Sequence, residues 1–234
     1  MRFFNLINYF NKFFKLIVFI GFILNFSIAV AGSYEDFFAA IKNDQVKVVS
    51  NLLNRGFDPN TVSLEAEPAM HYALRAGALK SFEVLVKHPK INLNVKNAHG
   101  ETALMLVCLK GQFELSKLLM GRQADINQPG WTPLHYAATG GNHQIVQMLL
   151  EESAYIDAES PNGSTPLMMA ARYGSTKAVQ VLIDEGADVE LKNQLGLTAL
   201  DFAIQGVRPD AVELISKKLA QIRAERPLKA ADKH

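Results

Sequence analysis

The side chains of this 234-residue chain that could bind a metal ion or act as a base or nucleophile are six histidines and one cysteine. Zinc sites place such residues at short, characteristic spacings. No such spacing occurs among His88, His99, His143, His234 and Cys108. The chain has no G-x-S-x-G motif, no phosphate-binding loop and no Cys–His pair with an orienting residue. We therefore expect no metal, no cofactor and no catalytic residue, and we expect that the protein is not an enzyme.

Paired carboxylates occur at Asp157 and Glu159 and again at Asp188 and Glu190. Such pairs can carry out general acid–base chemistry. Their recurrence at matching positions of a repeated segment favours solvated loop charges instead. Cys108 lies within an apolar helical pattern, which indicates a small buried side chain rather than a reactive thiol. A single cysteine also cannot form a disulfide within the chain.

The segment TPLHYA at 132–137 recurs along the chain at nearly constant spacing. Related segments are PAMHYA, TALMLV, TPLMMA and TALDFA. The third residues of the five segments are Met70, Leu104, Leu134, Leu167 and Leu200, so the steps are 34, 30, 33 and 33 residues. A repeat of about 33 residues is typical of proteins built from stacked helical units. The spacing therefore predicts an all-α fold.

Each repeat predicts a pair of short helices. In the clearest repeat, Thr132 is placed to cap a helix that has Pro133 at its first position. Apolar residues then follow with i, i+3, i+4 spacing, and Gly140-Gly141 ends the helix. A second apolar pattern over 145–150 predicts the second helix. One such pair hides too few apolar side chains to offset its conformational entropy, so the pairs must stack.

These residues resemble the ankyrin-repeat family over about residues 34–226. The family motif is TPLHxAA…G…(I/V)V…LL…GAD(V/I)N, and QADIN at 123–127 and GADVE at 186–190 are similar to its end. The resemblance implies a solenoid of about six stacked helix-turn-helix repeats with short hairpin-like loops and a concave groove that binds other proteins. The units expected are a signal peptide (1–31), an N-terminal capping repeat (32–63), four ankyrin repeats (64–98, 99–128, 129–161 and 162–194), a C-terminal capping repeat (195–226) and a basic tail (227–234).

Some residues depart from this motif. The 30-residue step falls at 127–130, which indicates a shortened loop and not a lost helix. His71 and His135 keep the histidine of the motif, for which the resemblance implies a local hydrogen bond that holds the loop against the helix. The other departures are Pro68 in place of the capping threonine, Met105 and Met168 in place of the histidine, and Ser153 and Val207 in place of a glycine.

The resemblance also implies that a partner is contacted by side chains in the loops and just after the two alanines of each first helix. The partner-binding residues expected on this basis are His99, Glu101, Leu109, Lys110, Trp131, Thr139, Ser164, Arg172, Tyr173, Leu195, Leu197 and Gln205, with Arg75, Ala98, Asn162 and Gln194 at equivalent positions. Trp, Tyr and Arg are enriched in binding hot spots, which singles out Trp131, Arg172 and Tyr173. Trp131 has the alternative of packing on its own loop.

Residues 1–31 are predicted to be a secretory signal peptide. They contain three basic residues and no acidic one, followed by an apolar run over 16–29 and an A-x-A pattern that ends at Ala31. The apolar run is shorter than the roughly 20 residues of a membrane-spanning helix. Cleavage after Ala31 gives a periplasmic or secreted protein. The alternative is a retained anchor in the inner membrane.

Charge separates the body of the chain from its end. Residues 32–216 carry 15 basic and 21 acidic side chains, net −6, whereas residues 217–234 carry six basic and two acidic ones, net +4. A slightly acidic body argues against binding to nucleic acid, which requires clustered cations. We expect a monomeric, non-enzymatic module outside the cytoplasm that binds another protein. The alternatives are a membrane-tethered adaptor that keeps its anchor and a secreted enzyme or small-molecule binder.

Overall fold

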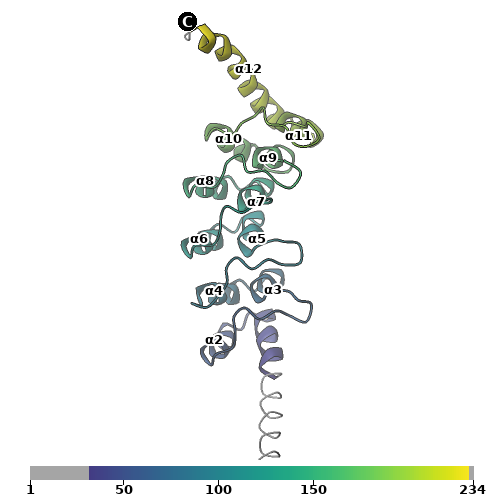
Figure 1. Ribbon diagram of the computed structural model, residues 1–234. Coiled ribbons are helices and arrows are strands. Elements are labelled where there is room, and N and C mark those ends of the chain that lie inside the picture. The colour runs from purple at the N-terminus through teal and green to yellow at the C-terminus, as the bar shows by residue number, and fades with distance from the viewer. Residues whose placement is uncertain (1–31, 232–234) are drawn as a thin grey trace, which may run out of the picture.

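A computed structural model describes residues 32–231, and every regular element within them is a helix (Figure 1). The helices pair in chain order into stacked units, so the all-α solenoid predicted from the repeat is confirmed. The predicted signal peptide and residues 232–234 of the basic tail lie outside the described residues. After helical residues 32–42, the helices are α2 (Val46–Asn54), α3 (Ala69–Ala76), α4 (Leu79–Lys87), α5 (Ala103–Leu109), α6 (Phe113–Gly121), α7 (Pro133–Gly140), α8 (His143–Glu151), α9 (Pro166–Tyr173), α10 (Thr176–Asp184), α11 (Ala199–Gln205) and α12 (Pro209–Ala231).

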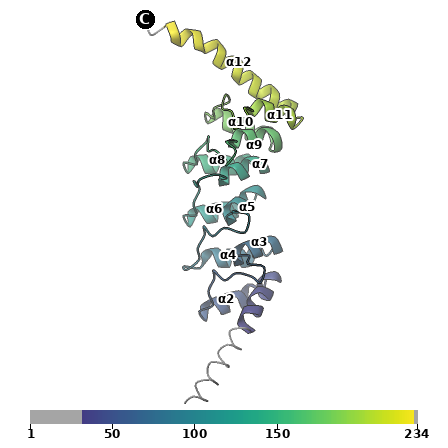
Figure 2. The ribbon, with the colours of Figure 1, turned by 45° about the vertical axis from the view of Figure 1, so that its right-hand side comes forward.

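The helices form two columns that stay in single file in both views (Figures 1 and 2). The inner helices α3, α5, α7, α9 and α11 make one column, and the outer helices α2, α4, α6, α8 and α10 make the other. The loops that precede the inner helices project from the inner column (Figure 1). Two of these loops are closed by isolated antiparallel bridges, Val62 to Pro68 and Lys96 to Thr102.

The inner helices α5, α7, α9 and α11 begin at threonine caps, as the sequence predicts, whereas α3 follows Pro68. The hydroxyl of Thr132 accepts from the backbone N–H of His135 at 3.4 Å, and the backbone N–H of Thr132 donates to Nδ1 of the same histidine at 3.2 Å. In the next two repeats the threonine N–H donates instead to Sδ of Met168 (3.4 Å) and to a carboxylate oxygen of Asp201 (2.7 Å). Three different side chains therefore complete the same reciprocal cap.

Gly174 is required for space and not for a left-handed turn. Its φ is −81°, which any residue can adopt. A Cβ at this position would collide with the carbonyl oxygen of Ala138, one repeat earlier, and Gly140 is held in the same way against the carbonyl of Leu109. The inner column therefore packs backbone against backbone at these points.

Ser153 and Val207, which stand in place of a motif glycine, are left-handed, as is Gln123 at the start of the QADIN segment. Ser153 has φ 67° and Val207 has φ 53°. The left-handed region is unfavourable for a β-branched side chain. The departure at Val207 therefore carries local strain.

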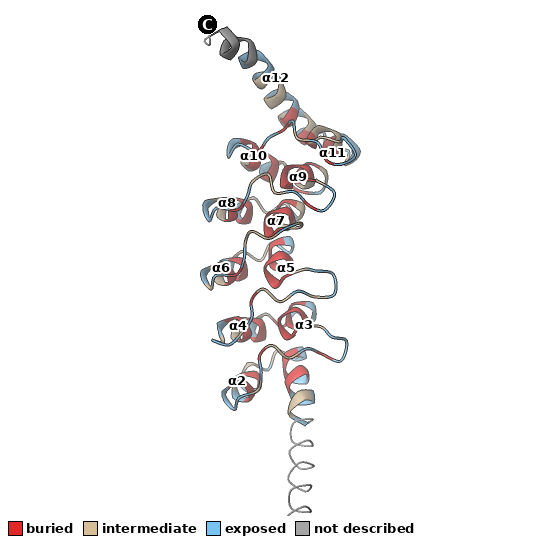
Figure 3. Ribbon diagram, in the orientation of Figure 1, coloured by how far each residue is buried: buried red, intermediate tan, exposed pale blue. Residues whose placement is uncertain are grey.

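The buried side chains form one continuous core that runs along the stack between the two columns (Figure 3). Each unit contributes fully buried side chains, for example Phe37, Phe82, Leu104, Leu134 and Leu167. Cys108 is also buried, and burial raises the pKa of its thiol to about 12. The prediction that Cys108 is a buried side chain is confirmed.

The last helix, α12, is longer than the repeat pattern predicts. It continues to Ala231 and so runs past residue 226, where the sequence places the end of the last repeat. No glycine occurs between residues 207 and 231 to end it. Its far part projects beyond the stack (Figures 1 and 2). Among residues 32–231, no helix is both long enough and apolar enough to cross a membrane.

Candidate protein-binding surface

The loop tips and the C-terminal ends of the inner helices together form what we call the inner surface of the stack. Polar side chains at the base of each loop set the shape of its tip. The side-chain oxygen of Asn97 accepts from the backbone N–H groups of His99 (2.9 Å) and Glu101 (3.0 Å). Asn193 binds the N–H groups of Leu195 and Leu197 in the same way, both at 3.0 Å. The expected contact residues in these tips are thus held by fixed backbone.

The loop that precedes α7 is short, as the 30-residue step predicts, and both helices of that repeat, α7 and α8, are present. The amide of Gln128 closes the loop by donating to the carbonyl of Trp131 at 2.7 Å. The indole of Trp131 is half-buried, and its ring lies 5.3 Å from the ring of His135 in an edge-to-face arrangement. Trp131 therefore packs against its own repeat.

A ladder of side chains links each repeat to the next on the outer-helix side of the loops. Each rung is an Asn or Asp oxygen that accepts a backbone N–H from the following repeat. The rungs are Asn60 to Asn92 (2.7 Å), Asn94 to Asp125 (2.9 Å), Asn127 to Tyr155 (2.9 Å) and Asp157 to Asp188 (3.1 Å). These bonds fix the distance between neighbouring repeats and so the spacing of the inner surface.

The prediction that Asp157 is a solvated loop charge is wrong, because its carboxylate is a rung of this ladder. The residue is half-buried, and this burial, together with the charge of Asp188, raises the pKa of its carboxyl group. Asn127, one repeat earlier, is neutral and also donates to the carbonyl of Ser153 at 2.9 Å. Asp157 lacks an N–H to make the equivalent bond.

We therefore expect Asp157→Asn to stabilise the protein at pH 7 by about 1 kcal/mol, because it removes a partly buried charge and adds one donor. That gain corresponds to a rise of roughly 2–4 °C in the melting temperature. The reciprocal variant Asn127→Asp should lower the melting temperature by a similar amount. Equal shifts of the same sign in both variants would contradict the role of the rung.

His71 and His135 are buried and join consecutive repeats. Nε2 of His71 donates to the carbonyl of Glu101, and Nε2 of His135 donates to the carbonyl of Ser164, both at 2.9 Å. Burial lowers the pKa of both rings, that of His135 to about 4. Both rings are therefore neutral at pH 7 and hold the next loop in place.

The cap of His71 is incomplete because of Pro68. Proline has neither an N–H nor a hydroxyl, and Nδ1 of His71 is buried without a hydrogen-bond partner. We expect Pro68→Thr to stabilise the protein by about 1 kcal/mol, because it supplies both missing donors. Pro68→Val restores only the N–H and should give a smaller gain. Urea unfolding of the three proteins tests this order, and a Thr variant no more stable than the Val variant would contradict it.

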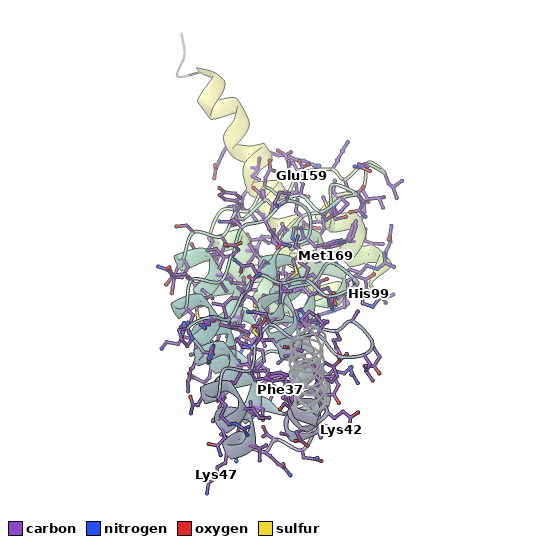
Figure 4. The ribbon with its side chains drawn as sticks, turned by 60° about the horizontal axis from the view of Figure 1, so that its bottom comes forward. Phe37, Lys42, Lys47, His99, Glu159 and Met169 are labelled. Atoms are coloured by element: carbon purple, nitrogen blue, oxygen red, sulfur yellow. The ribbon has the colours of Figure 1, made fainter. Side chains whose placement is uncertain are left out.

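The expected contact residues range from exposed through half-buried to buried in the structure. Exposed side chains are those of His99, Leu109, Lys110, Tyr173, Leu195 and Gln205. Half-buried ones are Glu101, Trp131, Thr139, Arg172 and Leu197. His99 lies at the edge of the stack when the molecule is viewed toward its N-terminal end (Figure 4). The exposed set leaves side chains on the inner surface that can reach a second protein.

Ser164 does not belong to this set. It is 1% exposed, its backbone N–H donates to Oγ of Ser160 at 3.0 Å, and its carbonyl binds His135. The expectation that Ser164 lies off the buried stripe is wrong, because the loop folds back onto the inner helix of the preceding repeat.

Side chains of neighbouring repeats are linked across the inner surface. Arg172 donates to the side-chain oxygen of Gln205 at 2.9 Å, and its guanidinium lies 5.2 Å from the ring centre of Tyr173. The hydroxyl of Tyr136 donates to Glu101 at 3.0 Å. Burial and this carboxylate raise the pKa of Tyr136 to about 12. These links hold several expected contact residues in defined positions.

Several hollows mark the surface of the described residues, and two of them bear on the candidate site. The first, of about 360 Å³, lies between the loops that precede α3 and α5. It is lined by Glu65, Ala66, Glu67, Arg75, Asn97, Ala98 and His99. Arg75 pairs with Glu67 at 2.8 Å at its wall. The motif pointed to Arg75, Ala98 and His99, whereas Glu65 and Glu67 belong to no motif position.

The second hollow, of about 600 Å³, lies between the outer helices α6 and α8 and was not predicted. Half-buried Phe113, Met120 and Met148 line it, and Gly121 contributes no side chain. Apolar residues of outer helices are expected in any repeat, so the sequence carried no signal for it. In the part of the chain that the structure describes, no group of three or more His, Cys, Asp or Glu side chains is placed to hold a metal ion.

Comparison with known families agrees with this architecture. A family model described as ankyrin repeats (3 copies) matches residues 89–160 and 141–226, which together make up more than half of the chain.

Among curated proteins, ankyrin repeat and SAM domain-containing protein 6 of Rattus norvegicus is 32% identical over 109 residues. Transient receptor potential cation channel subfamily A member 1 of Homo sapiens is 28% identical over 122 residues. The matches cover 45% and 50% of this chain but only 12% and 11% of those relatives. The Notch-regulated ankyrin repeat-containing protein of Xenopus tropicalis is 37% identical over 89 residues, which are 36% of this chain and 78% of that protein.

Proposed function

Because the chain belongs to the ankyrin-repeat family, whose repeats indicate a protein–protein interaction module, we propose that it is a non-enzymatic binding protein that works outside the cytoplasm. The partner is a folded protein or a segment of one, bound on the inner surface. An interface of ordinary size buries about 800 Å² on each partner, which several neighbouring loop tips and inner-helix ends can supply together.

The observation that carries this proposal is the exposure of large side chains on the inner surface. Tyr173 is 54% exposed and Leu109 is 37% exposed. Neither side chain is needed to fill the core, and Tyr173 is held by the Arg172 guanidinium. Rigid aromatic side chains beside arginine are frequent centres of binding energy.

The test begins with crosslinking in the native envelope to identify the bound protein, followed by affinity measurements with the purified pair. We expect Tyr173→Ala to weaken binding at least about tenfold, because truncation of a central aromatic residue costs more than 1.4 kcal/mol. The melting temperature should stay within about 1 °C. Tyr173 is a cleaner choice than Trp131, whose ring packs on His135.

Tyr155 provides the matched control, since it is also an exposed tyrosine (69%) but lies in the loop after the outer helix α8. Tyr155→Ala should leave the affinity unchanged. If Tyr155→Ala and Tyr173→Ala have equal effects, the inner surface is not the binding site.

Export is the second part of the proposal and is tested separately. N-terminal sequencing of the protein recovered from its native location should give Gly32 as the first residue, after cleavage at Ala31. Recovery with residues 1–31 intact would instead support a tethered adaptor.

A further inference from the structure

The last inner helix, α11, has an apolar side chain where the other inner helices are covered by a neighbour. The position six residues after the first residue of each motif is at most 3% exposed in the earlier repeats, where it is Leu74, Cys108, Ala138 and Ala171. In the last repeat this position is Ile204, which is 57% exposed. Val207, just after α11, is 83% exposed. Terminal repeats of stacked proteins usually present a polar outer face, so this end resembles an interior surface without its neighbour.

The helix α12 leaves this end only partly covered. Its first turns pack on the stack through Ala211 and Ile215, which are 1% and 0% exposed. Beyond them the helix projects past the last repeat (Figures 1 and 2). Helices that stand alone in water are marginally stable. A second surface laid against α12 would therefore both stabilise the helix and cover Ile204.

The charges on the outward face of α12 suit a second copy of the same helix. Residues 210, 213, 217, 220 and 224 recur at helical spacing opposite Ile215, and all are exposed. Lys217 lies at the edge of this face, because it also borders a hollow between α12 and α10. Asp210 and Glu213 are acidic, Lys217 is basic, and Ala220 and Ala224 are small enough for a close approach. When two such helices run antiparallel, Glu213 of each copy faces Lys217 of the other. The helix dipole accounts for acidic residues in the first turns but not for the exposed apolar side chains beside them.

We propose that the C-terminal end of the stack is a twofold interface between two copies of this chain. The two α12 helices lie antiparallel, and each copy covers Ile204 and Val207 of the other. Such an interface is self-complementary and closes after two copies. The sequence alone predicts a monomer, because the repeat pattern does not report that Ile204 and Val207 are left exposed at the end of the stack. This interface borders the inner surface at the end of α11, next to Gln205, whereas Tyr173 and Leu109, which carry the partner-binding proposal, lie on inner helices of earlier repeats.

Sedimentation velocity at 1–100 μM on the chain from residue 32 onward, which contains the whole described core, tests the proposal. We expect a species of twice the monomer mass. Ile204→Asn should raise the dimer dissociation constant at least about tenfold, since it places an amide at the centre of the contact. Leu64→Asn is the control: Leu64 is 88% exposed in the loop of the second repeat, so this change should leave the dissociation constant unaltered.

A charge exchange provides a second measurement that does not depend on apolar packing. Glu213→Lys and Lys217→Glu should each weaken the dimer about fivefold or more, because each places like charges opposite one another. The double variant should return to within about twofold of the original, because the pair is only interchanged. Circular dichroism should show unchanged melting for all of these surface variants.

The proposal is overturned if the chain keeps the monomer mass up to 100 μM. The C-terminal end of the stack would then be a surface for a different protein. The proposal is equally overturned if a dimer forms but neither Ile204→Asn nor the charge variants weaken it, since the contact would then lie elsewhere. The proposal is supported if the double charge variant restores the dimer and Ile204→Asn weakens it.

Discussion

Gly174→Ala is expected to destabilise the protein by about 3 kcal/mol, although it adds a single methyl group. The added Cβ would meet the carbonyl oxygen of Ala138, the Cα of Ala170 at 2.9 Å and the carbonyl oxygen of Ala170 at 3.0 Å. All three atoms belong to backbone, so no flexible side chain can move aside. Inserting atoms into such a contact forces helices apart, and the cost falls at the upper end of the range for overpacking. Urea unfolding followed by circular dichroism measures the effect.

Gly121→Ala is the control for this prediction. Gly121 also lies in a helix, but nothing comes within 4 Å of an added Cβ there. Alanine is a better helix former than glycine by up to about 1 kcal/mol, so this variant should be as stable as the original or slightly more stable. Equal unfolding midpoints for Gly174→Ala and the original chain would show that the close approach of α9 to α7 does not select glycine.

The second large effect concerns stability against pH at His135. The pKa of this histidine is about 4 in the folded protein because burial disfavours the charged ring, whereas an unfolded histidine has a pKa near 6.5. Between these values the unfolded chain binds a proton and the folded chain does not. The free energy of unfolding should therefore fall as pH decreases from about 6.5 to 4, by up to about 1.4 kcal/mol per pH unit and roughly 3 kcal/mol in all. Burial lowers the pKa of His71 as well, which acts in the same direction.

The chain itself suggests the variant that separates this effect from the other titrating groups. Met105 and Met168 occupy the same position in neighbouring repeats and accept the threonine N–H at 3.3 Å and 3.4 Å. His135→Met should keep the cap but lose the bond to the carbonyl of Ser164, at a cost of about 1 kcal/mol at pH 7. It does not titrate, so at pH 4.5 it should be more stable than the original chain.

Urea unfolding at pH 7.5, 6.5, 5.5 and 4.5 should therefore give stability curves that cross. Parallel curves would show that protonation of His135 does not control acid stability. The remaining titrating groups are the same in both proteins, so they cannot produce a crossing.

The helix pairs were predictable because their signals are local. Thr132 and Pro133 start a helix by bonds and dihedral preferences within one turn. Asp201 completes its cap three residues from Thr198, and the sequence shows both residues. The shortened fourth loop also follows from counting residues, since both neighbouring helices keep their motifs. Features that depend on neighbours within about four residues were therefore available from the sequence.

The candidate surface was predictable only in part, because exposure depends on residues far along the chain. Ser164 occupies a contact position of the motif, yet it is covered by the preceding repeat through His135, 29 residues away. Asp157 resembles a loop charge, but its carboxylate binds a backbone N–H 31 residues later. The repeat spacing shows which residues of neighbouring repeats lie opposite one another, but it does not show which side chains face inward.

By itself, the sequence determined the repeat, where the threonine-capped inner helices begin and the kind of binding expected, because hydrogen bonds and apolar periodicity inside one repeat suffice for these. Only the tertiary structure decided which side chains of the inner surface stay in contact with water, why Gly174 must be glycine and how α12 leaves Ile204 exposed. These properties arise from contacts between repeats, where the distance between two backbones and the direction of the last helix are set by packing and not by local preference.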